Sequence, residues 1–329
     1  MSFLGCLFRC IRVNTALLLT LACFGGLTLC ELQAASEDSA SSVLGGMTRW
    51  TMINVTPKTA QADCHLLEFP DGTKVLVDPA DAVDAPGTAL AYLQQHQIKH
   101  LELVVISHFH LDHYGRLVDI VKAGIQIDRV AINLPADRSV ADRERPWGCD
   151  WDHVQSVLQF LRERKIPYFT PIAGEVLIAR VVNGVAVKLE VVCLYDGIHT
   201  PVGETMVNDT SIVLRLSHGA TRALFTGDLD LRLGAWLAQS HFDLAADIIK
   251  VPHHGAEVHP PNEFYDRVNP KVALVSAPKA LWLGSLRCKR LRDYFSAHSI
   301  PAYVTGLNGH VTVNMTAQGF SIQPEHSIK

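Results

Sequence analysis

The sequence predicts an α/β domain in which two β-sheets pack face to face and helices cover their outer sides. Apolar runs of strand length alternate along the chain with segments whose apolar residues recur at helical spacing, which is the first observation behind this prediction. The second is that the same alternation occurs in both halves, so each half is expected to supply one sheet with its helices. With 329 residues, 48% hydrophobic and 19% charged, the chain has enough apolar material for one large core.

The first half predicts strands where short apolar or β-branched runs lie between turn residues, at 50–55, 65–69, 74–77, 101–106 and 130–133. The sequence Pro-Asp-Gly-Thr at 70–73 joins two of them as a hairpin turn. Helices are predicted at 88–96, 114–122 and 150–164. The polar, arginine-rich segment 134–148 is predicted to be a loop insertion. Two interpretations stay open for Trp147 and Trp151: packing in the core, or the border of a substrate cleft.

The second half repeats this pattern of strands and helices. It predicts strands at 176–182, 185–193, 212–216, 222–226, 247–251, 272–276 and 302–305. Helices are predicted at 231–240, 261–268 and 285–297. Glycine-containing segments at 183–184 and 217–220 mark tight turns between neighbouring strands.

The N-terminal residues have the features of a secretory signal. Arg9 and Arg12 precede an apolar stretch at 15–30, and small residues follow it. We therefore divide the chain into a signal peptide at 1–35, a linker at 36–46 and one folded domain at 47–329. The expected location is the periplasm or the extracellular space. The alternative is an uncleaved N-terminal anchor, although the apolar stretch is shorter than the roughly 20 residues that span a bilayer.

Charge and cysteine content narrow the classes of function only slightly. The formal net charge of −4 gives no global attraction toward nucleic acid. The spacing of the cysteines in the folded domain matches no zinc finger. In an oxidising compartment these cysteines are compatible with one or two disulfides, and buried free thiols are the equal alternative. They are Cys64, Cys149, Cys193 and Cys288.

The motif with the most chemical information is His-Phe-His-Leu-Asp-His at 108–113, directly after the apolar run 101–106. Its imidazoles and its carboxylate are ligands that suit a borderline divalent metal such as Zn²⁺. This spacing lets the end of one strand supply ligands to two adjacent ions. His108 and His110 can face one ion, and Asp112 with His113 the other.

Two further strand ends carry candidate ligands. Asp228 follows a strand and Gly227, and a carboxylate in that position can approach a metal closely and bridge two ions. His253 and His254 stand together before Gly255 at the end of another strand. One of the two is expected to bind metal, and the other to support a ligand or to face substrate.

The order of these motifs, HxHxDH, then Thr-Gly-Asp, then His-His-Gly, each after a strand, resembles the metallo-β-lactamase family. More narrowly, the chain resembles the hydrolase domain of ComEC-type DNA-uptake proteins and their stand-alone secreted relatives. The resemblance runs from about residue 50 to 323. The matching stretches are 53–55, 61–64, 69–72, 77–78, 208–214, 226–228 and 250–255.

The resemblance implies an αββα four-layer sandwich with two zinc ions at one edge between the sheets. It assigns His108 and His110 to the first ion and Asp112 and His113 to the second, with Asp228 bridging the two. For the last ligand it favours His254, because the histidine before the glycine matches the common Gly-His-Gly form of that motif. His253 is the alternative.

The chain departs from the family before the strand that leads to Asp228. Most hydrolases of this fold carry a further histidine there, whereas this chain has Asn208 and Asp209, and the ComEC-like group also has asparagine. The first ion is therefore expected to lack one protein ligand, which Asn208, Asp209, water or substrate can replace. His199 is another candidate for this missing ligand. The alternative is that His199 is an ordinary histidine in a surface loop. His310 is a candidate for substrate contact, or an ordinary residue at the start of a strand.

The resemblance implies a zinc-dependent hydrolase in which a metal-bound hydroxide attacks a phosphoryl or carbonyl centre. Asp112 or Asp228 is expected to take the proton. The likeness to ComEC favours a phosphodiester substrate, either DNA or another phosphate ester. The basic cluster at 287–292 is either a phosphate-binding surface or a solvated helix face.

Two alternative functions remain open at this point. One is a lactonase or β-lactamase-like carbonyl hydrolase, and the other is a non-catalytic, metal-containing binding protein. Turnover of phosphodiester, lactone and β-lactam substrates distinguishes the hydrolases, whereas retained metal without turnover would favour the binding protein. No obligate protein partner is evident, and membrane contact is expected only through an uncleaved N-terminal segment.

We expect most copies of the mature protein to be exported and to lack the residues up to about Ala34 or Ala35. The reason is the basic start followed by the apolar stretch 15–30, which is typical of a cleaved signal. N-terminal sequencing of the protein recovered from the exported and cytosolic fractions measures this. An intact Met1 on cytosolic protein would contradict the expectation.

Overall fold

The computed structural model describes residues 45–195, 206–256 and 259–327, which belong to one compact unit. The predicted signal peptide at 1–35 and the candidate His199 lie outside the described residues. Within those ranges the chain forms two large sheets and a small one made of β4 (His100–Leu101) and β6 (Gln126–Ile127). No helix in the described ranges is long and apolar enough to cross a membrane.

The first sheet has the strand order β17-β16-β1-β2-β3-β5-β7-β8 in the described chain. Its strands are β1 (Thr48–Met52), β2 (His65–Glu68), β3 (Lys74–Val77), β5 (Leu103–Ile106), β7 (Val130–Ile132), β8 (Tyr168–Phe169), β16 (Val311–Thr316) and β17 (Gly319–Pro324). The sheet is mixed, because β3, β5, β7 and β8 pair in parallel whereas the other neighbours are antiparallel.

The second sheet has the order β15-β14-β13-β12-β11-β10-β9, again for the described residues. Its strands are β9 (Val176–Val182), β10 (Val185–Cys193), β11 (Val213–His218), β12 (Thr221–Phe225), β13 (Ile248–Lys250), β14 (Val272–Val275) and β15 (Ala302–Val304). The strands from β12 to β15 are parallel, and the remaining pairs are antiparallel.

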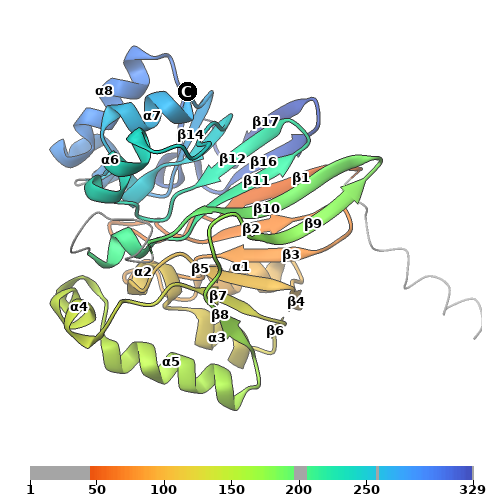
Figure 1. Ribbon diagram of the computed structural model, residues 1–329, viewed down its shortest axis with the longest axis vertical. Coiled ribbons are helices and arrows are strands. Elements are labelled where there is room, and N and C mark those ends of the chain that lie inside the picture. Colours follow the sequence, from red (N-terminus) through yellow and green to blue (C-terminus); the bar gives the residue numbers. More distant parts are fainter. Residues whose placement is uncertain (1–44, 196–205, 257–258, 328–329) are drawn as a thin grey trace, which may run out of the picture. The chain divides into compact units, whose positions relative to one another are not determined.

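Helices cover the outer face of each sheet, which confirms the predicted αββα arrangement (Figure 1). The first sheet is covered by α1 (Thr88–Gln95), α3 (Leu117–Lys122) and α5 (Trp151–Glu163). The second is covered by α6 (Leu231–Gln239), α7 (Asn262–Val268) and α8 (Lys289–Ala297). The short helices α2 (Leu111–Tyr114), α4 (Arg138–Arg143) and α9 (Thr305–Asn308) lie in connections.

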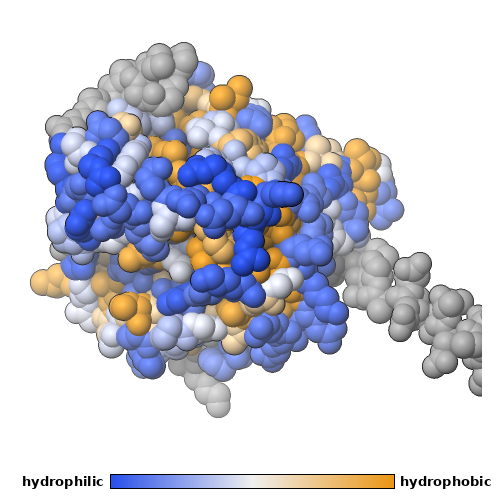
Figure 2. All heavy atoms as spheres, turned by 90° about the horizontal axis from the view of Figure 1, so that it is seen from below, coloured by the Kyte–Doolittle hydropathy of each residue, from blue (hydrophilic) through white to orange (hydrophobic). Residues whose placement is uncertain are grey.

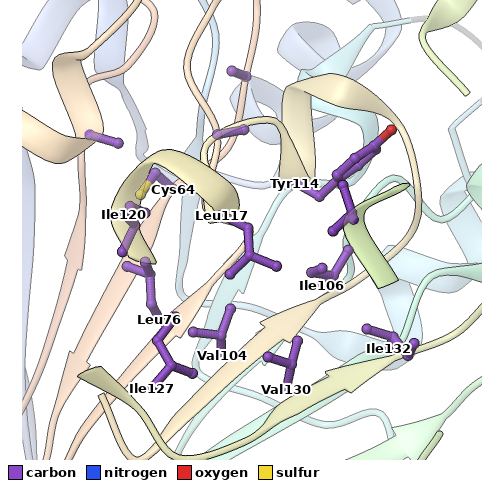
Figure 3. Packing of buried hydrophobic residues seen from close by; sticks show 14 of the residues in the cluster. Cys64, Leu76, Val104, Ile106, Tyr114, Leu117, Ile120, Ile127, Val130 and Ile132 are labelled. Carbon is purple, nitrogen blue, oxygen red and sulfur yellow. The ribbon is translucent and has the colours of Figure 1, made fainter. Parts of the chain in front are cut away.

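Three apolar clusters correspond to the three interfaces between the layers. Between the sheets, Trp50 of β1 packs on Phe225 of β12, with ring centroids 4.3 Å apart. On the outer face of the first sheet, Leu117 and Ile120 of α3 lie over Val104 of β5 and its neighbours (Figure 3). Each fully buried side chain of this kind stabilises the fold by roughly 1.5–3 kcal/mol, so the layers hold one another in place.

Helix α5 shows how a single amphipathic segment becomes an outer layer. Asp150 begins it, because its carboxylate accepts hydrogen bonds from the backbone N–H groups of Asp152 and His153. Val154, Leu158 and other apolar residues then face the first sheet. Seen from below in Figure 2, the side of the molecule that carries α5 is mainly hydrophilic, with scattered hydrophobic areas.

The expectation that each half supplies one sheet is wrong in one respect. Strands β16 and β17, beyond the last predicted strand, form a hairpin that pairs with β1, where Thr48 lies opposite Met315. The first sheet therefore combines the first half with the C-terminal end of the chain. Val311, Val313 and Met315 alternate with polar residues and point into the core between the sheets, which is a period-two signal present in the sequence.

The insertion at 134–148 is not a plain loop. It contains α4, which Asp137 begins by accepting hydrogen bonds from the backbone N–H groups of Ser139 and Val140. A 3₁₀ turn, Arg145–Trp147, follows it. The Asp-Arg-Ser sequence at 137–139 is an N-cap signal that the polar composition of the segment concealed.

The cysteines of the described chain form no disulfide. Cys64, Cys149, Cys193 and Cys288 are all buried thiols. Cys64 lies in the outer cluster of the first sheet and Cys288 in that of the second, on opposite sides of the sandwich. Of the two alternatives left open by the sequence, the structure has the buried thiols.

We expect Gly234→Ala to lower the free energy of unfolding by about 1–3 kcal/mol. A Cβ atom at this position of α6 would lie 2.5 Å from the Cβ atom of Pro260, and this overlap outweighs the better helix propensity of alanine. Gly284→Ala is the matched control, because a Cβ atom there meets nothing within 4 Å. Urea unfolding of both variants measures the difference, and equal midpoints would contradict the prediction.

Candidate metal centre

The candidate ligands lie where strands of both sheets end. The motif at 108–113 follows β5, Asp228 follows β12, and His253 with His254 follows β13. These strands belong to the parallel parts of their sheets, so their carboxyl ends meet at one edge of the sandwich, where α2 lies (Figure 1). The sequence segments that carry the chemistry are thereby brought together in space.

Asp228 is the centre of this group of side chains. Its Oδ1 atom lies 3.2 Å from Nε2 of His113, and its Oδ2 atom lies 3.3 Å from Nε2 of His254. Nε2 of His254 is also 3.5 Å from Oδ2 of Asp112. His113, His254 and Asp228 are buried, so two carboxylates and two imidazoles face one small volume inside the protein.

The backbone at these strand ends is adapted to bring the side chains close. Gly227 has a φ of 52°, and a Cβ atom on it would lie 2.6 Å from Oγ of Ser211, so only glycine fits before Asp228. His253 and His254 have φ angles of 49° and 53°, in the left-handed region that non-glycine residues seldom occupy. Such conformations persist where the surroundings require them, and here they turn His254 into the cluster.

Hydrogen bonds to the far side of each ring orient the two imidazoles. Nδ1 of His113 lies 3.0 Å from Oδ2 of Asp78, and Nδ1 of His254 donates to the carbonyl oxygen of Ser276 at 2.8 Å. Because these contacts keep a proton on Nδ1, Nε2 is the atom of each ring that can give up its proton and face a metal. This is the tautomer that a metal ligand requires.

His108 and His110 form a second pair beside the first group. Nε2 of His108 and Nδ1 of His110 are 3.2 Å apart, and the His108 ring lies close to that of His113, with centroids 4.1 Å apart and the planes tilted by 49°. Burial and the neighbouring His113 lower the pKa of His108 well below its usual value, so it is neutral and free to act as a ligand. The structure therefore brings together all four polar residues of the HxHxDH motif.

The cluster fits a divalent metal. Ligand atoms bound at about 2.0–2.1 Å in tetrahedral geometry are roughly 3.3–3.5 Å from one another. The contacts from Asp228 to His113 and His254, at 3.2 and 3.3 Å, have this spacing. The Nε2 atoms of His113 and His254 are buried and have no hydrogen-bond partner in the described structure, so an ion would satisfy both.

The electrostatics of the cluster favour a cation. Burial by itself lowers the pKa of His254, but the carboxylates of Asp228 and Asp63 outweigh it and raise the pKa to about 10. Burial also tends to raise the pKa of Asp228, but His113, His254 and Lys250 hold it well below its usual value. The carboxylate therefore stays ionised and draws positive charge into the site.

Two buried charged residues near the cluster were missed as functional candidates from the sequence. Asp63, just before β2, forms an ion pair with Lys250, the last residue of β13. Lys250 is 1% exposed in its side chain, donates to the carbonyl oxygen of Gly227 at 2.9 Å and lies 3.4 Å from Oδ1 of Asp228. A lysine inside the apolar run 248–251 is the sequence signal that could have identified it, because an uncompensated lysine is hardly ever buried.

Asp63 belongs to the cluster by distance but lies behind the rings. Together with His113, Asp228 and His254 it forms a group whose candidate ligand atoms all lie within 4.8 Å of one another. However, its carboxylate approaches Nδ1 of His113 at 3.7 Å and Nδ1 of His254 at 3.9 Å, not the Nε2 atoms that face Asp228. We infer that Asp63 orients the imidazoles, and that Asp112 occupies the metal-facing side.

The other sequence candidates have different surroundings. Asn208 and His253 line a cavity in front of the cluster, and Nε2 of His253 is 4.0 Å from Oδ2 of Asp228. Asp209 does not line this cavity. Its carboxylate accepts a hydrogen bond from the backbone N–H of Asp230, and burial raises its pKa to about 6.

His310 accepts a hydrogen bond from the backbone N–H of Asn54 and lines neither of the cavities at the cluster.

Two adjoining cavities open in front of the cluster. The first, of about 470 Å³, is lined by His110, Asp112, Asp228 and other residues. The second, of about 680 Å³, continues away from the metal ligands and shares Gln61, Asp112, Trp147 and Arg287 with the first. Volumes of this size suit small-molecule substrates or a segment of a polymer.

Trp147 thus borders a cleft, one of its two predicted positions, whereas Trp151 packs against the outer core.

Residues 58–134 match the family model of the metallo-beta-lactamase superfamily. This chain contains a metallo-β-lactamase superfamily domain. The matched segment includes the HxHxDH motif and both Asp63 and Asp78, which contact His113. The matched family and the buried cluster of histidines and aspartates are those of a metal-dependent hydrolase domain.

Curated relatives cover parts of the chain. ComE operon protein 3 of Bacillus subtilis (strain 168) is 24% identical over 196 residues, which are 58% of this chain and 22% of that protein. The uncharacterized protein YcaI of Escherichia coli (strain K12) is 29% identical over 117 residues, 35% of this chain and 15% of that protein. The chain therefore has distant homology to a ComEC-type protein and spans less than a quarter of the length of either relative.

Solved structures with a similar chain path include Igni18, described as a novel metallo hydrolase from the archaeon Ignicoccus hospitalis. Its TM-score is 0.48 at 14% identity, over 80% of this chain and 98% of that chain.

We expect Asp228→Ala to remove bound metal, because its carboxylate lies between His113 and His254. His110→Ala should be nearly as severe, since His110 is one of the two histidines that pair beside the first group. Asp209→Ala is the matched control: it removes a buried carboxylate of the same region that faces a helix start, and it should leave the metal content unchanged.

Elemental analysis of the zinc-loaded variants measures the stoichiometry directly. Wild-type protein should bind close to two ions, or one tightly and one weakly. Full metal content in the Asp228 variant would show that the ligand set is wrong, and loss of an ion in the Asp209 variant would make Asp209 itself a ligand.

Proposed function

We propose that this protein is a zinc-dependent phosphodiesterase, acting on DNA or another phosphate ester. Zinc suits the ligand set, because imidazole nitrogens and carboxylate oxygens are its usual ligands outside thiolate sites. When bound, it would lower the pKa of a coordinated water toward neutrality and polarise a phosphoryl oxygen. The candidate ligands in our scheme are His108, His110, Asp112, His113, Asp228 and His254.

The observation that carries this proposal is the composition of the first cavity. The lining of this cavity includes Asp112 and Asp228, which belong to the metal cluster, and also the guanidinium-bearing Arg287. A phosphodiester is a small anion, so a site for it needs cationic groups on more than one side. Arg287 supplies such a group in the same cavity, and a neutral lactone or ester would have no use for it.

The residues of the protein would have the following roles in hydrolysis. Asp112 lines both cavities and is partly open to solvent, so its carboxylate can take a proton from the attacking water. Asp228 is enclosed, and Lys250 and the two imidazoles fix its position. Asn208, on the cavity wall, stands where many relatives carry a histidine, and its amide can contact substrate. The distant homology to a ComEC-type protein supports the same substrate class.

We also propose that the protein is exported by its N-terminal segment, or stays anchored by it, and works without an obligate protein partner. The support is the basic and apolar pattern of residues 9–30. Buried thiols are compatible with either side of a membrane, so the location rests on the N-terminal pattern alone.

Zinc-loaded protein should hydrolyse bis-(p-nitrophenyl) phosphate and should lose this activity on chelation. Nitrocefin and a simple lactone are the comparison substrates, because they report β-lactamase and lactonase chemistry. Asp209→Ala should retain some phosphodiesterase activity, whereas Asp228→Ala should have none. Turnover of a lactone or of nitrocefin without any turnover of the phosphodiester would refute the proposal.

A further inference from the structure

Trp147 is an exposed aromatic residue beside the metal cluster. The chain has five tryptophans, all within the described residues, and the other four are buried or half-buried. The indole of Trp147 is 65% exposed and lines both cavities at the point where they adjoin. An exposed indole that lines a cleft offers a flat aromatic face to a ligand.

The position of Trp147 is fixed by contacts to the metal motif. Its backbone N–H donates to the carbonyl oxygen of Glu144 at 2.9 Å, and the Glu144 carboxylate lies 3.7 Å from Nε2 of His110. The next residue, Gly148, approaches Leu111 so closely that a Cβ atom on it would lie 3.2 Å from the Leu111 backbone nitrogen. The backbone that carries the indole therefore has a set place relative to the candidate ligands, as a binding platform requires.

The groove around Trp147 is balanced in charge and partly apolar. Arg287 and Arg116 line the second cavity, opposite the carboxylates of Asp81 and Asp112. Arg116 already pairs with Asp81 at 3.2 Å and with Asp119 at 2.9 Å. The whole chain has a net charge of −4. A net charge of this sign gives an anionic polymer no overall attraction, so its affinity has to come from specific contacts.

We propose that Trp147 and Arg287 form a subsite for the nucleotide next to the scissile phosphodiester, with the base stacked on the indole and the neighbouring phosphate bound by the guanidinium. This inference rests on the proposed phosphodiesterase function. Every base has a π-face, so stacking on an exposed aromatic ring holds single-stranded nucleic acid with little regard to sequence. Arginine is the side chain whose planar donors match a phosphate. The second cavity gives this nucleotide room beyond the metal ligands.

The test compares two dye-labelled trinucleotides with phosphorothioate linkages, which hydrolyse slowly during a titration. One carries a base at every position, and the other is abasic at the central one. Fluorescence anisotropy with the zinc-loaded protein measures both dissociation constants. We expect wild-type protein to bind the first about tenfold more tightly, the size of one base–aromatic contact.

Substitutions distinguish the contribution of Trp147 to binding from that of Arg287. Trp147→Ala should bind both strands equally, and Trp147→Phe should retain part of the preference. Arg287→Gln should weaken both strands by a similar factor while keeping the preference. Leu286→Ala is the matched control, because Leu286 is exposed beside Arg287 but lines neither cavity, and it should bind like wild type.

Hydrolysis of bis-(p-nitrophenyl) phosphate by the wild-type protein is measured alongside. Turnover without any preference for the strand that carries the base would overturn the subsite while the proposed function stands. A preference that survives in Trp147→Ala would overturn the role of the indole. Absence of phosphodiester turnover in zinc-loaded protein would instead remove the function on which the subsite depends.

Discussion

The buried carboxylate of Asp228 is the constraint on which the rest of the structure depends. It sits at the edge of the sandwich where strands of both sheets end, 3.2 Å from Nε2 of His113 and 3.3 Å from Nε2 of His254, and it is almost completely buried. A buried anion without partners would destabilise the fold by several kcal/mol, so cationic groups have to surround it. Lys250 and the imidazoles do so, and the same negative charge makes the place attractive to a metal ion. Stability and metal binding thus have one electrostatic origin.

The partners of this carboxylate also tie the two halves of the sandwich together. Asp78, after β3 of the first sheet, accepts hydrogen bonds from the backbone N–H and the hydroxyl group of Ser107 and contacts His113. Asp63, before β2, pairs with Lys250 of β13 in the second sheet. Because the Asp63–Lys250 pair and the contact between Asp228 and His113 cross between the sheets, the metal site can form only when the sheets have docked. The geometry of the centre therefore depends on the whole fold, because the polar residues that hold the candidate ligands in place come from both sheets.

The proposed recognition of substrate has a separate structural basis. The candidate metal ligands follow strands, whereas Trp147 comes from the insertion at 134–148 and Arg287 from the irregular segment before α8. Loops of this kind can change without disturbing the packed sheets, so one metal centre can serve different substrates in related proteins. Gly148 and Glu144 nevertheless connect the insertion to Leu111 and His110. The insertion that lines the cleft is therefore held in place by contacts to the metal motif, although it contributes no candidate ligand.

The amino-acid sequence by itself determined the two-sheet architecture and the residues that meet at the cluster, because period-two and helical apolar patterns and the HxHxDH spacing are local signals. It did not reveal the C-terminal hairpin on β1, the short helix α4, or the buried Asp63–Lys250 pair. It also left open which of His253 and His254 faces the centre, and whether Trp147 lies in the core or in the cleft. Only the tertiary structure decided these points, because each depends on contacts between segments far apart in the chain, and on the left-handed backbone that turns His254 inward. Side-chain direction at a strand end is set by the sheet that packs against it, and no local pattern encodes that partner.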